Sequence, residues 1–144
     1  MNNIIIELIQ EKGKNPKIPK RKRDGDAAYD IYAQEPIYLF PDRQKAIPLG
    51  FKMQLPEGYC AMIIERSGHA KNNALHSIGP LIDQNYRGEV HAILLNSGFD
   101  NIQFETGDRI AQMLVFPYYV KEPIVGKVDT TERGENGLGS SGTK

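Results

Sequence analysis

The chain has 144 residues, of which 40% are hydrophobic and 25% are charged. This length suits one domain with one buried core, and this composition excludes wholesale disorder and a fibrous architecture. Lys plus Arg and Asp plus Glu both number 18, so no net charge draws the chain to duplex nucleic acid or to an anionic membrane, and we expect no stable binding to either.

Short strands are the elements that the sequence predicts along its length. Glycines and prolines interrupt the chain and leave no long apolar pattern of helical period, so we expect little helix. Segments rich in Ile, Val, Leu or Tyr lie between turn-forming residues and predict strands at residues 3–9, 28–33, 46–55, 58–65, 89–95 and 109–115. Strands at this spacing indicate an all-β sandwich, barrel or jelly roll.

Two segments lack the strand pattern. Residues 12–23 carry seven basic side chains, and we interpret them as a solvated loop, with a nucleic-acid or localisation patch as the alternative. Residues 130–144 are polar and glycine-rich and cannot bury themselves. We therefore expect one β-rich domain over residues 1–129 and a flexible tail over residues 130–144, which is either disordered or ordered by a ligand.

Targeting features and cysteine content favour a cytoplasmic location. The apolar run at residues 4–6 has no basic region before it, so it does not form a signal peptide. No stretch approaches the roughly 20 apolar residues of a membrane span. Cys60 is the single cysteine, which excludes an internal disulfide and a zinc site of paired cysteines, and its apolar neighbours favour a buried, inert thiol.

The first candidate site residues stand where a predicted strand ends, at Arg66, Ser67 and Gly68. A guanidinium, a hydroxyl and a close backbone suit phosphate oxygens, although a simple turn is the commoner explanation for such a tripeptide. Asp83 follows an apolar pair and precedes Tyr86. This carboxylate could act as a base or be a turn acid, and the aromatic ring could face a sugar or pack in the core.

Further candidates lie near the C-terminus. Residues 107–112 form a turn before an apolar run, and a hairpin with a charged pair is the plain alternative. Residues 133–143 combine Arg133 with glycines and hydroxyls that could wrap a polyphosphate, although glycine-rich tails are usually linkers. His69, His76 and His91 lack the spacing of metal ligands, and the sequence contains no P-loop and no nucleophile elbow.

In this order, and with residues 27–33 ahead of them, these segments resemble the five motifs of the trimeric dUTPase family. The resemblance runs from about Asp24 to Thr143. It implies a jelly-roll-like dUTPase (β-clip) fold, assembled as a homotrimer with exchanged C-terminal segments and with active sites at the subunit interfaces.

The resemblance also implies the activity, which is hydrolysis of dUTP to dUMP and pyrophosphate by Mg²⁺-dependent attack of water at the α-phosphate. Such an enzyme limits uracil in DNA and supplies dUMP for dTMP synthesis. By this resemblance Asp83 activates the water, Tyr86 lies under the deoxyribose and excludes a 2′-hydroxyl, and Asp30 contacts a water on a Mg²⁺ ion held mainly by the phosphates.

The remaining substrate contacts are likewise implied by the resemblance. The triphosphate would be held by Arg66, Ser67, Gly68, Gln112 and Arg133, and the tail would add Leu138, Gly139 and Ser140. The uracil would be read near Leu81, Ile82 and His91, with Ser77 where the family has an Asn, so that Asn72 or Asn73 could supply the missing amide. Leu138 replaces the usual Phe and Pro80 a common Gly, which predicts a weaker hold on the base.

Three other functions compete with this interpretation. The related dCTP deaminase group shares the fold and several motifs, but the contexts of Asp83 and Tyr86 favour the diphosphatase. A nucleotide sensor without catalysis is disfavoured by the intact Asp83. A purely structural trimer is disfavoured because the phosphate-facing residues are all present.

Overall fold

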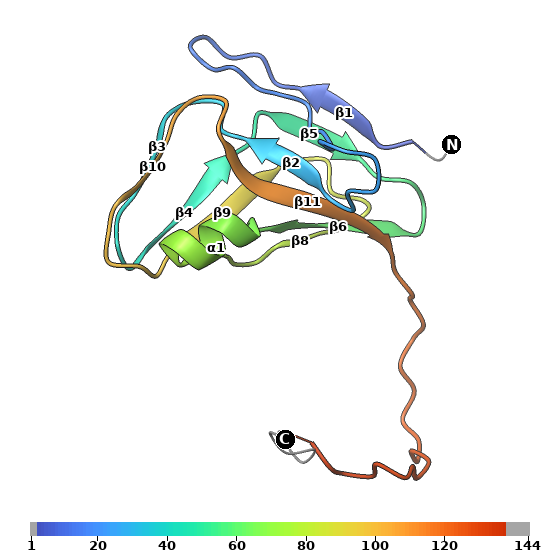
Figure 1. Cartoon of the computed structure of the whole chain (residues 1–144). Coiled ribbons are helices and arrows are strands. Elements are labelled where there is room, and N and C mark those ends of the chain that lie inside the picture. The colour runs from blue at the N-terminus through green and yellow to red at the C-terminus, as the bar shows by residue number, and fades with distance from the viewer. Residues whose placement is uncertain (1–2, 138–144) are drawn as a thin grey trace.

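The computed structural model describes residues 3–137 of the chain and shows an all-β fold with one short helix. Figure 1 traces the elements in chain order. They are β1 (Ile5–Leu8), β2 (Tyr29–Tyr32), β3 (Ile37–Leu39), β4 (Arg43–Pro48), β5 (Phe51–Gln54), β6 (Tyr59–Ile64), α1 (Ser67–Asn73), β7 (Leu75–Ser77), β8 (Leu81–Ile82), β9 (His91–Asn96), β10 (Ile102–Phe104) and β11 (Arg109–Pro117).

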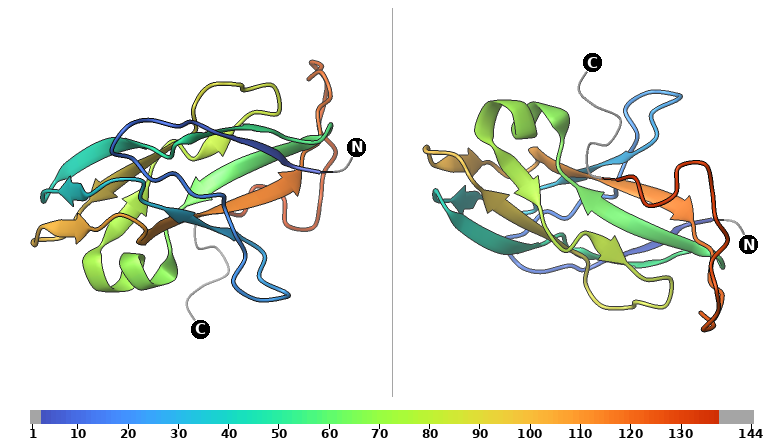
Figure 2. Two further views of the ribbon diagram at one scale, coloured as in Figure 1. Left: turned by 90° about the horizontal axis from the view of Figure 1, so that it is seen from above. Right: turned by 90° about the horizontal axis from the view of Figure 1, so that it is seen from below.

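The strands form four small antiparallel sheets rather than one continuous sheet. The largest has the order β2-β11-β6-β8, the next has the order β4-β9-β7, and β1 with β5 and β3 with β10 make two pairs. In Figure 1 the β1–β5 pair and α1 lie on opposite sides of β11, and in Figure 2 most strands run along the long dimension of the body. Crossovers between distant strands therefore bring four separate sequence segments together in the β2-β11-β6-β8 sheet.

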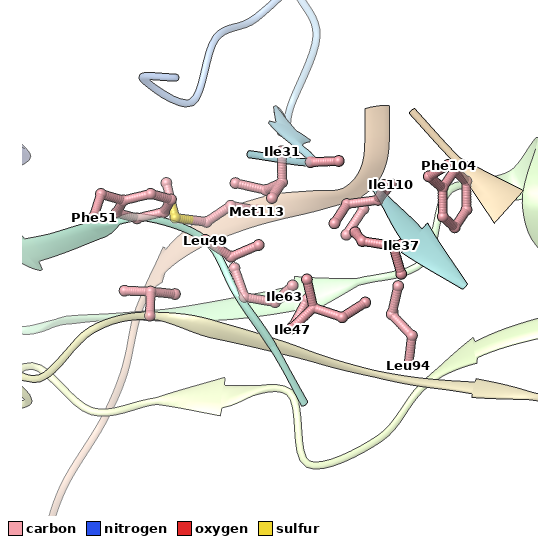
Figure 3. Close-up of a cluster of buried hydrophobic side chains, with 14 of the residues drawn as sticks. Ile31, Ile37, Ile47, Leu49, Phe51, Ile63, Leu94, Phe104, Ile110 and Met113 are labelled. Carbon is pink, nitrogen blue, oxygen red and sulfur yellow. The ribbon is translucent and has the colours of Figure 1, made fainter. Parts of the chain in front are cut away.

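Alternation along the strands separates a core face from an outer face. Ile63 on β6 and Met113 on β11 are cross-strand partners, both almost fully buried, and Figure 3 shows them in the central cluster with Ile31 of β2. Because successive side chains of a strand point to opposite faces, their neighbours Ile64 and Gln112 point away from this cluster. The outer face of the largest sheet is thus free to carry polar groups.

The prediction of one strand over residues 46–55 was wrong, because the chain bends at Gly50 and forms β4 and β5 in different sheets. Gly50 has φ +73°, and a Cβ there would lie 2.6 Å from the Cβ of Pro16. The bend therefore needs glycine both for its dihedral and for space. The other five predicted strands are confirmed with shifts of a few residues at their ends.

Two kinds of element went unpredicted. The strands β3, β7, β8 and β10 have three residues or fewer, too few to show an alternating pattern. The helix α1 follows Arg66 directly, where the sequence indicated only a turn, and it closes at Ala74 in the left-handed region with the Ala74 N–H donating to the His69 carbonyl.

The chain leaves the body after β11 and continues as an extended arm, seen in orange and red at the lower right of Figure 1. The apolar side chains of this arm are almost fully exposed: Ile124 90%, Val125 107% and Val128 88%. The division into a domain at residues 1–129 and a tail at residues 130–144 stays a prediction. The helix of the described region is too short to cross a membrane.

Candidate active site

Three predicted site segments meet on the outer face of the largest sheet. Gln112 of β11 pairs with Asp30 of β2 on one side and with Ile64 of β6 on the other. Residues paired directly across antiparallel strands point to the same face, so Asp30 and Gln112 share the face opposite the core. Arg66 follows two residues after Ile64 and reaches the same row.

The carboxylate of Asp30 joins two arginines from different segments. One oxygen lies 3.2 Å from Arg66 Nε, and the other accepts a hydrogen bond of 3.2 Å from Arg109 Nη1. The Asp30 side chain is 14% exposed and the arginines 29% and 36%, so each guanidinium keeps an open side. The carboxylate therefore orders two cations without hiding them from a ligand.

These groups line a cleft of about 690 Å³. The N-terminal residues of α1 contribute Ser67 and Gly68, and a Cβ at Gly68 would meet no atom within 4 Å. The cleft also has walls from the loop before β2. Its lining residues are Lys22, Arg23, Asp26, Ala27, Ala28, Asp30, Ile64, Arg66, Ser67, Gly68, Arg109, Gln112 and Leu114.

Gln112 and Ser77 both have hydrogen bonds to the segment between β6 and α1. Gln112 Nε2 donates to the carbonyl of Glu65 at 3.0 Å, so its amide is already fixed against the strand end. Ser77 Oγ donates to the carbonyl of Ile63 at 2.6 Å, and the Ser77 N–H donates to the Glu65 carboxylate at 3.0 Å. These bonds tie Ser77 to β6, and Asn72 and Asn73 lie exposed at the end of α1.

Asp83 lies in a different hollow, at the other end of β6. It follows β8, which pairs with Ala61 and Met62, and it shares its hollow with Cys60 and Tyr118. Cys60 and Arg66 are separated by roughly 20 Å along the extended chain, given ~3.3 Å per residue. The exposed Asp83 of one chain and the Asp30 cleft of the same chain are therefore two separate surfaces.

Tyr86 is held in the turn that follows Asp83. Its N–H donates to the Asp83 carbonyl at 3.1 Å, and its hydroxyl donates to the Glu89 carbonyl at 2.9 Å. The ring covers Gly88, where an added Cβ would lie 2.6 Å from Tyr86 Cζ. His91 at the start of β9 bonds the same Glu89 carbonyl through Nδ1 at 2.9 Å, so both rings are fixed by one backbone group.

A metal held by the protein alone does not fit this site. No group of three His, Cys, Asp or Glu side chains able to hold an ion occurs within residues 3–137. Asp30 offers a single carboxylate beside the cationic cleft. This donor set fits a hard ion such as Mg²⁺ only if phosphates and water supply most of its oxygen ligands.

Comparison with known proteins decides the family. The sequence matches the dUTPase family over residues 14–142. It is 38% identical over 138 residues to a deoxyuridine 5′-triphosphate nucleotidohydrolase of Clostridium novyi, covering 94% of this chain and 97% of the relative. A protein of the same name from Orientia tsutsugamushi (strain Ikeda) is 39% identical over 146 residues, covering 97% of each chain. The chain belongs to the dUTPase family.

A solved structure of the family has the same fold. A variant of the Staphylococcus bacteriophage 80alpha dUTPase with dUpNHpp superposes with a TM-score of 0.89 at 26% identity, covering 99% of this chain and 100% of that chain. The expected dUTPase fold is thus confirmed, and the chain is a nucleotide hydrolase by family.

The single dUTPase chain brings some of the predicted site residues together and leaves others apart. Asp30, Arg66, Ser67, Gly68 and Gln112 line one cleft. Leu81 and Asp83 line the second hollow, with Ile82 between them in the chain, whereas Tyr86 and His91 meet at the Glu89 carbonyl. Arg133 lies in the extended arm, where its Nε donates to the Asn136 carbonyl at 2.9 Å, and Leu138, Gly139 and Ser140 lie outside the described residues.

Sequence reasoning missed three cations of this cleft. Arg109 stands inside the recognised segment 107–112, and its spacing from Gln112 gave no sign that it would pair with Asp30. Lys22 and Arg23 were assigned to a solvated loop, because a run of basic residues carries no information about which side chains face a cleft.

Proposed function

We propose that this chain hydrolyses dUTP to dUMP and pyrophosphate through Mg²⁺-dependent attack of water at the α-phosphate. The observation that carries the proposal is the cleft in which Asp30 orders Arg66 and Arg109 beside Gln112. Two ordered guanidiniums with open sides suit a triphosphate, since arginine binds phosphate oxygens through parallel N–H donors. Family membership and relatives named as dUTP hydrolases support the choice of nucleotide.

The active unit in this proposal is a homotrimer with sites at the subunit interfaces. Asp83 and Arg66 stand at opposite ends of β6, too far apart to act on one α-phosphate within a single chain. A neighbouring copy has to bring the Asp83 hollow to the Asp30 cleft. The exposed apolar side chains of the arm, Ile124, Val125 and Val128, support exchange of C-terminal segments, because a second copy would bury them.

Asp83 is the base in this mechanism. Its carboxylate is exposed and close to solvent, so it can accept a proton from a water placed against the α-phosphorus. Arg66, Ser67, Gly68 and Gln112 hold the phosphates and oppose the charge that develops on the leaving pyrophosphate. Tyr86, fixed through Glu89, lies under the deoxyribose and leaves no space for a 2′-hydroxyl.

Asp30 would hold a Mg²⁺ ion that arrives with the triphosphate, through a water molecule rather than directly. When bound, the ion supplies positive charge to the phosphate oxygens. Asp30 also keeps Arg66 and Arg109 in place, so one carboxylate has both a positioning and an ion-binding role.

The contacts to the uracil and the C-terminal tail complete the proposal. Backbone groups near Leu81 and Ile82, with His91 and Ser77 nearby, would read the uracil. Arg133 would reach the γ-phosphate, and Leu138, Gly139 and Ser140 would cover the ligand. In the cell, in a cytoplasmic location, the reaction would limit uracil in DNA and supply dUMP for dTMP synthesis.

A nucleotide panel tests the proposal. We expect the purified protein with Mg²⁺ to release pyrophosphate from dUTP far faster than from UTP, dTTP or dCTP. Asp83→Asn should lower this rate by about 10²–10⁴-fold, the usual contribution of a general base, with an unchanged melting temperature because the side chain is exposed. Binding of dUTP without turnover would instead indicate a sensor, and ammonia from dCTP a deaminase.

A further inference from the structure

The basic segment before β2 has two faces with different surroundings. Lys20 in this segment is bonded to Asp30 through the backbone, since the Lys20 N–H donates to the Asp30 carbonyl at 3.3 Å and the Asp30 N–H donates to the Lys20 carbonyl at 2.9 Å. The loop that follows therefore starts and ends beside the carboxylate that orders the two arginines of the cleft.

A tight turn fixes the tip of this loop. The Arg23 N–H donates to the Asp26 carboxylate at 2.9 Å, and the Asp26 N–H donates back to the Arg23 carbonyl at 3.3 Å. Gly25 lies inside this turn with φ +89°, a region that glycine adopts without strain. The backbone of Lys22 and Arg23 is therefore anchored on both sides.

The basic side chains of the loop divide between two hollows. Arg21 lies over the ring of Tyr29, with its guanidinium carbon 6.0 Å from the centroid, and lines a hollow with Tyr59. Lys22 and Arg23 line the cleft that holds Asp30 and Arg66. Adjacent residues of one basic run thus have different neighbours.

The charge of the cleft is strongly positive. Its lining includes four cationic side chains and only two carboxylates. Both carboxylates are already used, because Asp30 pairs with Arg66 and Arg109, and Asp26 accepts the Arg23 N–H. Neither Lys22 nor Arg23 has an ion-pair partner in the part of the chain that the structure describes. These two cations are available to an anion that enters the cleft.

We propose that Lys22 and Arg23 form an outer cationic rim of the phosphate cleft, which captures the incoming triphosphate and retains the pyrophosphate product. This inference deepens the proposed function and rests on it for the identity of the nucleotide. The rim residues are exposed, so an incoming anion meets them before it reaches the Asp30-ordered arginines, and dissolved salt screens their attraction. The two rim residues therefore act mainly on the capture of the triphosphate and the release of pyrophosphate.

The test compares two double variants that lose the same charge. The variant Lys22→Ala/Arg23→Ala removes the rim, and Lys12→Ala/Arg21→Ala removes two cations of the same segment that do not line the cleft. At low ionic strength the rim variant should have a KM for dUTP and a Ki for pyrophosphate about 5–10-fold higher than those of the natural protein. In 0.5 M salt the screening length falls to about 4 Å, so this difference between variant and natural protein should nearly disappear. The matched variant should keep both KM and Ki within about two-fold of the values for the natural protein.

A second readout separates this inference from the proposed function. Calorimetric titration with inorganic tripolyphosphate, which has neither base nor sugar, should give a Kd about 5–10-fold weaker for the rim variant only. This result would support the rim even if the natural protein failed to hydrolyse dUTP. Equal weakening in both variants, or none in either, would overturn the rim. Loss of single-stranded DNA binding in both variants with unchanged tripolyphosphate affinity would also overturn it and assign the segment to nucleic acid.

Discussion

Gly88→Ala should damage sugar selection while leaving the fold almost intact. A Cβ at residue 88 would come closest to the Tyr86 hydroxyl oxygen and would lie 2.6 Å from Cζ and 3.1 Å from Cε2, against about 3.4 Å for ordinary contact, so the ring must shift by roughly 1 Å. The dihedrals of Gly88 are not in the left-handed region, and the ring is 44% exposed and free to swing outward. The shift costs the hydroxyl bond to Glu89, about 1 kcal/mol.

The assay is the ratio of kcat/KM for dUTP over UTP. Displacement of a substrate-facing group by about 1 Å can cost up to 10²-fold, so we expect Gly88→Ala to lower kcat/KM for dUTP and to reduce the preference by at least about 10-fold. Tyr86→Phe is the control, since it loses the same hydrogen bond without pushing the ring. If Gly88→Ala keeps the preference within two-fold of the natural protein, Tyr86 does not exclude the 2′-hydroxyl.

Two further predictions concern stability and ordering of the cleft. Asp30→Asn removes the negative charge between Arg66 and Arg109, and because both arginines are about a third exposed, we expect the free energy of unfolding to fall by only about 1–2 kcal/mol. The melting temperature should then be lower by a few degrees, and tripolyphosphate should bind more weakly. Unchanged tripolyphosphate binding would refute the role of Asp30 in ordering the two arginines. Asn96→Ala removes a fully buried amide that donates to the carbonyls of Leu39 and Asp100 and accepts from the Gly98 N–H. Denaturant unfolding should show a free energy of unfolding lower by about 2–4 kcal/mol, whereas Asn101→Ala, at an exposed residue, should leave it almost unchanged.

The fold class was predictable because strand signals are local. Residues such as Ile63 and Met113 alternate with outward-facing neighbours, and this pattern survives in a single sequence. The bend at Gly50 escaped prediction because apolar residues continue on both sides of it. Strands of two or three residues form because a partner strand lies next to them, as β6 lies next to β8 and β9 next to β7, and no local pattern specifies that neighbour.

The candidate site was predictable as a set of segments and not as a geometry. Motif order identified the residues around Asp30, Arg66 and Gln112, and the sheet order β2-β11-β6 explains why they meet. The ion pair of Arg109 with Asp30 depends on register across two strands far apart in sequence, which no spacing reveals. Lys22 lines the cleft because of the turn that Asp26 closes, and the spacing of residues in the sequence does not reveal this either.

The placement of Arg66 and Asp83 at opposite ends of β6 has a genetic consequence. In the proposed homotrimer with sites at subunit interfaces, a mixture of two inactive polypeptides, one lacking the Asp83 carboxylate and the other lacking the Arg66 guanidinium, would still contain complete active sites wherever the intact Asp83 of one subunit faces the intact Arg66 of another. Random assortment would give about a quarter of such centres. Alleles that are each inactive alone could thus complement one another in a mixed cell.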